Sequence, residues 1–109
     1  MSAYVVFTRE ITLDKLELAT YSKEVLATLA EHEVKVLALY GSHEDLEGSS
    51  TEGTAILEFP SIDAAKAWYD SGPYQKVREH LFKGATYRVT LVEGAARPLR
   101  HWVEFAGAI

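Results

Sequence analysis

Two side chains of this sequence could move a proton near neutral pH. Glu58 lies in an apolar run, where burial would raise the pKa of its carboxyl group until it could act as a general base. His80 lies beside Val77 and Leu81 in an expected helix, and the ordinary pKa of histidine suits a proton shuttle. Each has a structural alternative, since Glu58 could pair with Arg88 on a neighbouring strand and His80 could be an ordinary surface residue. Glu58 and His80 are the candidate catalytic residues.

Aromatic side chains with polar tips form a second group, because they suit the wall of a pocket for a flat ligand. Trp68 and Tyr74 lie on either side of the Ser-Gly-Pro break at residues 71–73, and Tyr4 and Tyr40 lie in expected strands. The alternative for Trp68 is a place in the core beneath its helix, whereas Tyr74 lies nearer the expected mouth of a pocket. The predicted ligand-binding residues are aromatic or cationic: Tyr4, Tyr40, Trp68, Tyr74 and Arg88.

Several kinds of site are excluded by what the sequence lacks. There is no cysteine, which rules out disulfides, thiolate catalysis and cysteine metal sites and fits a reducing cytoplasm. The adjacent residues 43–45 (His-Glu-Asp) would not converge on one ion, and no second histidine lies at ligand spacing. Gly41, Gly48 and Gly53 are too far apart for a phosphate-binding loop or a dinucleotide fingerprint. We therefore expect neither a metal nor a cofactor.

The overall composition is that of one ordinary globular domain. The chain has 109 residues, of which 48% are hydrophobic and 25% charged, so it is long enough for a single modest core. Its net charge of −5, without a basic stripe, argues against binding a nucleic acid. No apolar run approaches the ~20 residues of a membrane span, and the first residues do not read as a signal peptide. We expect a cytoplasmic protein that binds neither nucleic acid nor membrane.

Hydrophobic periodicity predicts the order β-α-β-β-α-β, which is typical of a ferredoxin-like α+β fold. That fold has a four-stranded antiparallel sheet with its helices on one face. A solvated connection is expected at residues 41–53, and in the second helical region a shorter piece follows the break, from Pro73 to about Lys83. The other expected elements are strands at 3–9, 34–40, 54–59 and 87–93 and helices at 13–32 and from 61 to the break.

The expected strands are apolar on both faces, which a solvated second sheet face does not explain. Residues 34–40, 4–7 and 89–92 show this pattern, and the helices can cover only one face. A second copy of the chain could cover the other, giving a closed homodimer with the two sheets face to face. Residues 1–94 form the predicted domain, and residues 95–109 form an extension. Its large apolar side chains suggest packing on the body or on the partner.

The middle of the chain resembles a known family. Residues 57–61 (Leu-Glu-Phe-Pro-Ser) and 67–71 (Ala-Trp-Tyr-Asp-Ser) carry its linked signatures, and the likeness spans about residues 3–94. The sequence resembles domain-of-unknown-function family 1330, a group of small dimeric α/β-barrel proteins. The resemblance implies a ferredoxin-like homodimer whose two sheets form a central barrel. The wider superfamily includes cofactor-free monooxygenases, haem-degrading enzymes, isomerases and ligand-sensing modules, usually with pockets between sheet and helices.

This sequence departs from the family pattern at two cationic positions. Leu81 stands where members tend to carry an arginine, and Tyr40-Gly41 stands where they often carry Arg-Gly. The resemblance therefore implies weaker binding of a strong anion than in a typical member. Two functions remain open: a cofactor-independent monooxygenase- or isomerase-like enzyme acting on a small apolar or aromatic molecule, or a non-catalytic dimer that binds a small molecule.

Overall fold

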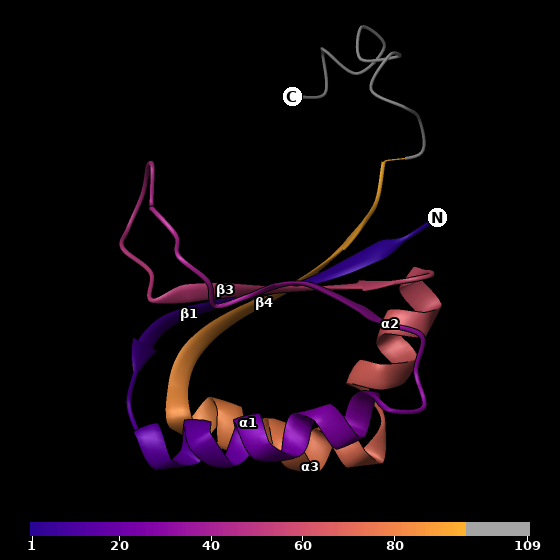
Figure 1. Ribbon diagram of the computed structural model, residues 1–109, viewed down its shortest axis with the longest axis horizontal. Helices are drawn as coiled ribbons and strands as arrows, with labels where there is room; N and C mark the ends of the chain where they lie inside the picture. Colours follow the sequence, from indigo (N-terminus) through magenta and orange to yellow (C-terminus); the bar gives the residue numbers. More distant parts are fainter. Residues whose placement is uncertain (96–109) are drawn as a thin grey trace, which may run out of the picture.

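The helices and strands follow the predicted β-α-β-β-α-β order, with the second helical region divided into two helices (Figure 1). The structure is a computed structural model and describes residues 1–95, so the predicted extension lies outside the described residues apart from its first residue. The elements in chain order are β1 (Ala3–Thr12), α1 (Lys15–Leu29), β2 (Lys35–Leu39), β3 (Gly53–Phe59), α2 (Ile62–Tyr69), α3 (Gly72–Gly84) and β4 (Ala85–Glu93).

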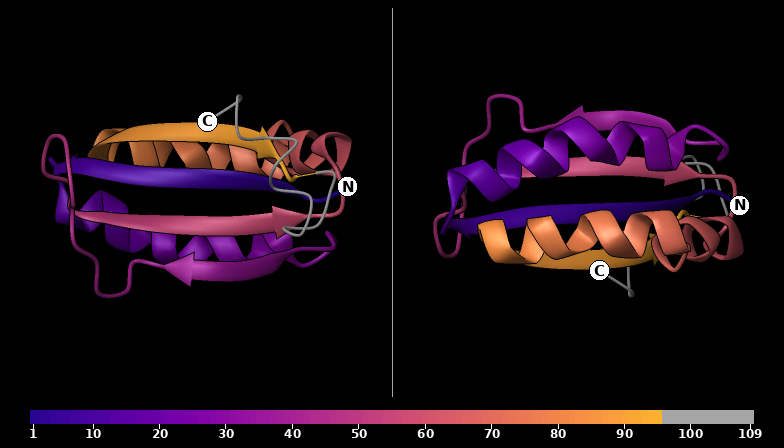
Figure 2. Two further views of the ribbon diagram at one scale, coloured as in Figure 1. Left: turned by 90° about the horizontal axis from the view of Figure 1, so that it is seen from above. Right: turned by 90° about the horizontal axis from the view of Figure 1, so that it is seen from below.

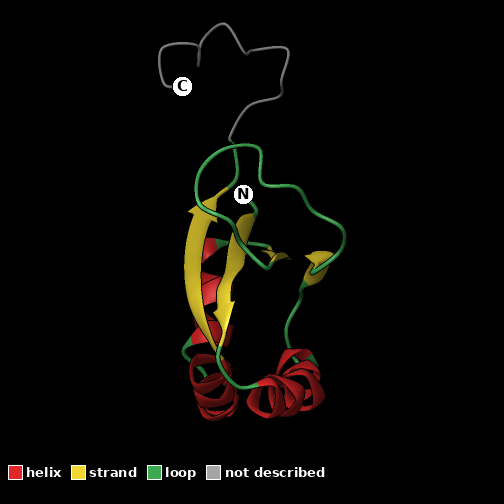
Figure 3. Ribbon diagram, turned by 90° about the vertical axis from the view of Figure 1, so that its left-hand side faces the viewer, coloured by secondary structure: helices red, strands yellow, loops and turns green. Residues whose placement is uncertain are grey.

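The four strands form one antiparallel sheet in the order β2-β3-β1-β4, which is the ferredoxin-like arrangement (Figure 2). Tyr4 of β1 lies opposite Glu58 on one side and Val92 on the other, which fixes the register of the three longer strands. Helices α1 and α3 lie side by side against one face, while no helix of residues 1–95 covers the other (Figures 2 and 3). We call these the inner and the outer face of the sheet.

Capping side chains determine where the helices begin. Asp14 accepts a hydrogen bond from the backbone N–H of Leu16 at 2.9 Å, and Ser61 accepts one from Ala64 at 3.0 Å. Ser71 caps α3, in which Pro73 occupies the first turn. Proline is favoured there because that turn needs no intrahelical N–H bond, so Pro73 favours the start of α3 at this point.

Two predicted helix lengths were wrong. The helical piece after the break is longer than the one before it, with 13 residues in α3 against 8 in α2. The first helix ends at Leu29 and not near His32, because the backbone N–H of Ala30 bonds back to Ala27 and tightens the last turn. Both errors concern helix ends, and the order of the elements is unaffected.

The core lies between the inner face and the helices. Val5 and Phe7 of β1 alternate with outward-facing neighbours, as Leu57 and Phe59 do on β3, and all four are buried. Trp68 of α2 is fully buried and stacks on Phe59, with ring centroids 5.6 Å apart. Its indole N–H donates to the hydroxyl of Thr28 on α1 at 3.0 Å, which ties α2 to α1.

The outer face carries apolar side chains that no part of residues 1–95 buries fully. Val6 and Ile56 are directly opposite each other at the middle of the sheet, and Val92 of β4 is 48% exposed. This agrees with the sequence pattern of strands that are apolar on both faces. Within residues 1–95, no helix has the length and apolar character needed to cross a membrane.

The hydrogen bond between Trp68 and Thr28 generates a prediction about stability. Thr28→Val leaves the buried indole N–H without a partner, which costs about 1–3 kcal/mol of unfolding free energy. Thr20→Val is the matched control, because Thr20 also donates to a helix carbonyl, that of Leu16, but bonds no tryptophan. Urea unfolding at equilibrium should show the larger loss for Thr28→Val. Equal losses in the two variants would mean that the indole bond contributes nothing.

Candidate functional site

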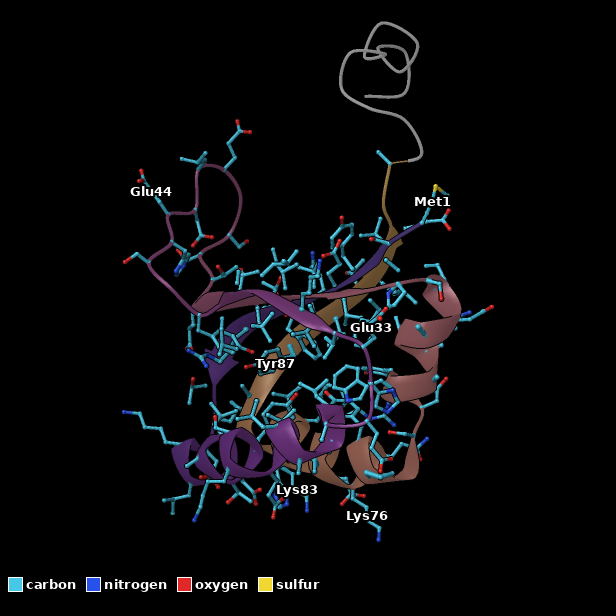
Figure 4. The ribbon with its side chains drawn as sticks, turned by 45° about the vertical axis from the view of Figure 1, so that its right-hand side comes forward. Met1, Glu33, Glu44, Lys76, Lys83 and Tyr87 are labelled. Atoms are coloured by element: carbon cyan, nitrogen blue, oxygen red, sulfur yellow. The ribbon has the colours of Figure 1, made fainter. Side chains whose placement is uncertain are left out.

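A cavity of about 310 Å³ lies between the inner face of the sheet and α1. Most of its lining is apolar, and the side chains come from both ends of the chain. The lining residues are Phe7, Arg9, Leu18, Tyr21, Ser22, Val25, Leu26, Leu29, Val36, Leu39, Tyr40, Ala55, Leu57 and Tyr87. Figure 4 shows Tyr87 in the space between the sheet and the helices.

The sequence pattern explains why these side chains meet. Leu18, Val25 and Leu29 recur at helical spacing and so lie along one face of α1. Opposite them, β3 presents Ala55 and Leu57, which both point to the inner face. Ala55 offers only a methyl group at the centre of the sheet, so the space above it is left unfilled. The cavity continues to the edge strand β2.

Four tyrosines supply the polar atoms in and beside the cavity. The hydroxyl oxygens of Tyr40 and Tyr87 are 2.8 Å apart, and those of Tyr21 and Tyr74 are 3.0 Å apart. In each pair one hydroxyl donates to the other, which leaves one hydroxyl proton per pair to bond elsewhere. Burial raises the pKa of Tyr21, Tyr40 and Tyr74 above the ordinary tyrosine value. These phenols therefore stay protonated and act as hydrogen-bond donors.

Tyr40 enters the cavity through an uncommon backbone conformation. Its φ of 53° lies in the left-handed region, which bulky residues rarely adopt, and its N–H donates to the carbonyl of Thr54 at 2.9 Å. Its ring lies against Gly53, where an added Cβ would come within 2.9 Å of the ring. Gly53 thus provides the room for the Tyr40 ring, and the strained conformation directs that ring towards the cavity.

Arg9 brings a positive charge to the same place. Its guanidinium carbon lies 4.7 Å from the centre of the Tyr40 ring, and its Nε donates to Glu52 at 3.1 Å. Glu52 also accepts hydrogen bonds from the hydroxyl and the backbone N–H of Thr12. These bonds from Thr12, with the nearby Arg9, lower the pKa of Glu52 and keep it ionised.

The predicted ligand-binding residues did not include three side chains with polar groups that line the cavity: Arg9, Tyr21 and Tyr87. Arg9 could have been found, because it continues the alternation of Val5 and Phe7 and is thus a charge on the predicted buried face. A charged residue on a buried strand face is rarely found without a partner. Tyr21 and Tyr87 gave no comparable signal, because a tyrosine is ordinary both in a helix stripe and in a strand.

The structure does not bring the five predicted ligand-binding residues together. Tyr40 lines the cavity, and Tyr74 reaches its border through the hydroxyl of Tyr21. Trp68 is fully buried among aromatic rings, 4.1 Å between centroids from Tyr74. Tyr4 and Arg88 lie on the outer face, away from the cavity.

Glu58 also lies on the outer face, where the hydroxyl of Tyr4 donates to it at 3.3 Å. The charge of Glu58 raises the pKa of Tyr4. The alternative partner considered for Glu58 was wrong, because Arg88 lies one strand further along, 3.9 Å from Glu10. Glu58 borders a separate hollow that includes Lys35, so it does not reach a ligand in the tyrosine-lined cavity.

His80 bridges the two long helices. Its Nδ1 lies 2.5 Å from a carboxylate oxygen of Glu17 on α1, and its Nε2 lies 3.7 Å from Glu24. It does not line the cavity, and its contacts join α3 to α1. Proton transfer by Glu58 or His80 stays a prediction.

No metal centre is formed by the residues that the structure describes. Within residues 1–95 there is no group of three or more histidine, cysteine, aspartate or glutamate side chains that could hold an ion. The acidic loop bonds to itself, since Asp45 accepts from both the N–H and the hydroxyl of Thr51 at 2.8 Å. His43 lies 3.0 Å from the carbonyl oxygen of the same Thr51.

Comparison with known sequences gives one match. The sequence model of a family described as "Domain of unknown function (DUF1330)" matches residues 2–95. No curated protein matches the chain.

Solved structures share the fold at low sequence identity. A protein of unknown function from Rhodopseudomonas palustris is 16% identical with a TM-score of 0.65, covering 89% of this chain and 84% of that one. A dimeric protein of unknown function with a ferredoxin-like fold, from Bacteroides fragilis, is 12% identical with a TM-score of 0.59, covering 85% and 96%. SnoaB, a cofactor-independent oxygenase from Streptomyces nogalater, is 10% identical with a TM-score of 0.57, covering 88% and 95%. These likenesses support the ferredoxin-like fold.

Proposed function

Because the chain belongs to the family described as "Domain of unknown function (DUF1330)", we propose a function from its own geometry: the inner-face cavity binds a small, largely apolar molecule. The observation that supports this proposal is the size and the apolar lining of the cavity. Its volume of about 310 Å³ is within the range of small-molecule sites, which are typically apolar with a few convergent polar groups. Tyr40, Tyr87 and Arg9 are such groups here.

The character of these polar groups favours binding over acid–base catalysis. The cavity lining within residues 1–95 contains no carboxylate and no histidine. Tyr21 and Tyr40 stay protonated, because burial raises the pKa of both phenols. A ligand with an oxygen acceptor would receive hydrogen bonds from them, but no side chain of the lining is suited to removing its proton.

A cofactor-independent oxygenase is a second candidate function, and the likeness to SnoaB favours it. In such a reaction the substrate supplies all four electrons: a CH₂ group becomes C=O, and the second oxygen atom of O₂ leaves as water. The cavity would contribute hydrogen-bond donors that stabilise an oxyanion form of the substrate, which is the form that reacts with O₂. The Tyr40–Tyr87 hydroxyl pair has one free proton, which is the donor available for this role.

The protein is further proposed to act as a homodimer through the outer face. Val6 and Ile56 form the apolar middle of that face, and the described helices lie on the opposite side. Two copies of such a face, packed sheet on sheet, bury apolar surface that is otherwise exposed to water. The dimeric ferredoxin-like protein from Bacteroides fragilis supports this assembly.

The binding proposal predicts that a charge at the cavity edge weakens binding. Leu39 lines the cavity and is 63% exposed, so Leu39→Glu should fold normally yet place a carboxylate beside an apolar ligand. A neutral probe, 2-naphthamide, should raise the melting temperature of the wild type, and Leu39→Glu should lower its affinity about tenfold.

Leu37→Glu is the matched control, because Leu37 is on the same strand, 52% exposed, and does not line the cavity. It should keep the wild-type affinity for 2-naphthamide. If 2-naphthamide does not raise the melting temperature of the wild type, the cavity does not bind it. If Leu39→Glu and Leu37→Glu bind the probe equally well, the cavity is not the binding site.

The oxygenase candidate predicts O₂ uptake that depends on the cavity hydroxyls. With a panel of phenols that carry a methylene group between two aromatic rings, the protein should consume one O₂ for each ketone formed. Replacing both Tyr40 and Tyr87 by phenylalanine removes the free donor of the cavity pair and should slow the reaction, whereas Tyr4→Phe on the outer face should not. Uptake is measured with an oxygen electrode, and the ketone by chromatography. No uptake above the protein-free rate with any member of the panel would leave binding as the function.

The dimer proposal predicts that a charge at the centre of the outer face separates the subunits. Ile56→Arg would bury an unpaired charge between the two sheets, so the variant should sediment as a monomer of 12.1 kDa. Leu16→Arg makes the same change on α1, where Leu16 is 80% exposed, and should stay at twice that mass. Sedimentation at micromolar concentration distinguishes the two masses. A wild type that sediments as a monomer would contradict the dimer proposal.

A further inference from the structure

The chemistry of the cavity specifies its ligand more closely, on the basis of the binding function proposed above. We propose that the ligand is a small carboxylic acid in its anionic form, with an apolar body. Its carboxylate is held by Arg9 and by the hydroxyl pair of Tyr40 and Tyr87, and its body lies along Leu57 and the apolar face of α1.

Arg9 is the charged side chain of the cavity lining within residues 1–95. It is only 24% exposed, so its charge is partly removed from water and acts more strongly on a neighbouring anion. Arg9 forms its ion pair with Glu52 through Nε alone, so that pair does not require the terminal nitrogens of the guanidinium group. A planar guanidinium also matches the geometry of a carboxylate, because two parallel N–H groups can bond both oxygens.

The guanidinium is held in place by contacts that leave its outer end available. The Nε atom donates to Glu52, which Thr12 in turn holds by two hydrogen bonds, and the guanidinium carbon lies 4.7 Å from the centre of the Tyr40 ring. Within residues 1–95, neither terminal nitrogen of Arg9 forms a hydrogen bond, so these two groups remain as donors. Glu52 is thus a positioning residue.

The strand register brings the tyrosine donors to the same end of the cavity. Tyr87 of β4 lies directly opposite Arg9 of β1, and neighbours across an antiparallel pair point to the same face. Tyr40 contacts both, through its hydroxyl and through its ring. One proton of the hydroxyl pair remains for a ligand oxygen, as a third donor beside the two of Arg9.

The other end of the cavity is apolar. Leu57 lies opposite Val5, four residues along β1 from Arg9, and Leu29 lies at the far end of α1. A ligand bound with its carboxylate at Arg9 would place its body against these side chains. The site therefore has one charged end and one apolar end, as a small aromatic or branched carboxylic acid has.

This inference reverses the sequence-level expectation that the pocket disfavours a strong anion. That expectation counted Leu81 and Tyr40 as two missing cations. Leu81 is almost fully buried and does not line the cavity, whereas Tyr40 carries the guanidinium of Arg9 on its ring. Arg9, which lies on β1, supplies the positive charge of the cavity instead.

The test compares two probes that differ mainly in charge, 2-naphthoate and 2-naphthamide, by calorimetric titration of the full chain at neutral pH. The wild type should bind the carboxylate at least about tenfold more tightly than the amide. Arg9→Met should remove this preference and leave the affinity for the amide nearly unchanged. Arg9→Lys keeps the positive charge but lacks the planar guanidinium group. Its preference for 2-naphthoate should therefore lie between those of the wild type and of Arg9→Met.

Arg78→Met is the matched control, because Arg78 also lies over a tyrosine ring, 4.9 Å from the centre of Tyr69, but does not line the cavity. It should keep the full preference for 2-naphthoate. Equal affinities of the wild type for the two probes would overturn the carboxylate proposal while the binding function stands. A loss of preference in Arg78→Met as large as in Arg9→Met would also overturn it, as a general charge effect. Binding of neither probe would contradict both proposals.

Discussion

The cavity exists because the hydrogen bonds described here that hold α1 to the rest of the domain all lie on one side of that helix. Its C-terminal half is tied to α2 by the hydrogen bond from Trp68 to Thr28, and its middle to α3 by the hydroxyl contact of Tyr21 with Tyr74. Near its start, the backbone carbonyl of Gly84 at the end of α3 accepts from the N–H groups of two residues, Leu13 and Asp14. All these contacts lie towards the α3 side, so α1 spans the sheet without filling the space beneath β2 and β3.

The tyrosine pairs that join distant elements also supply the polar groups of the proposed binding cavity. A buried phenol must keep its proton and find a partner, and the two tyrosine pairs satisfy that need with each other. Each pair leaves one donor over, so the contacts that stabilise the fold also leave hydrogen-bonding capacity near a ligand. At Tyr40 the arrangement includes strain, since a left-handed φ costs of order 1–3 kcal/mol and depends on the absence of a side chain at Gly53.

The sequence predicts well the features that depend on short-range patterns. The strand alternation, the cap at Ser61 and the burial of Trp68 follow from residue type and spacing, and the order of elements follows from them. The site depends on how distant segments meet: the hydroxyls of Tyr21 and Tyr74 are 53 residues apart in the chain. Alternation along β3 puts Glu58 on the same side of the sheet as Ile56, but it does not show that this side is opposite the cavity.

The proposed ligand and the proposed partner subunit would use different surfaces of this fold. Period-two alternation sends Val6 and Ile56 to the outer face and Phe7 and Leu57 to the inner one, so neighbouring residues of one strand serve separate purposes. The cavity reaches the edge strand β2, where Leu39 remains exposed. In the proposed dimer the partner packs on the outer face, whereas this edge belongs to the inner-face cavity. The two proposals therefore predict that ligand affinity is independent of the state of assembly.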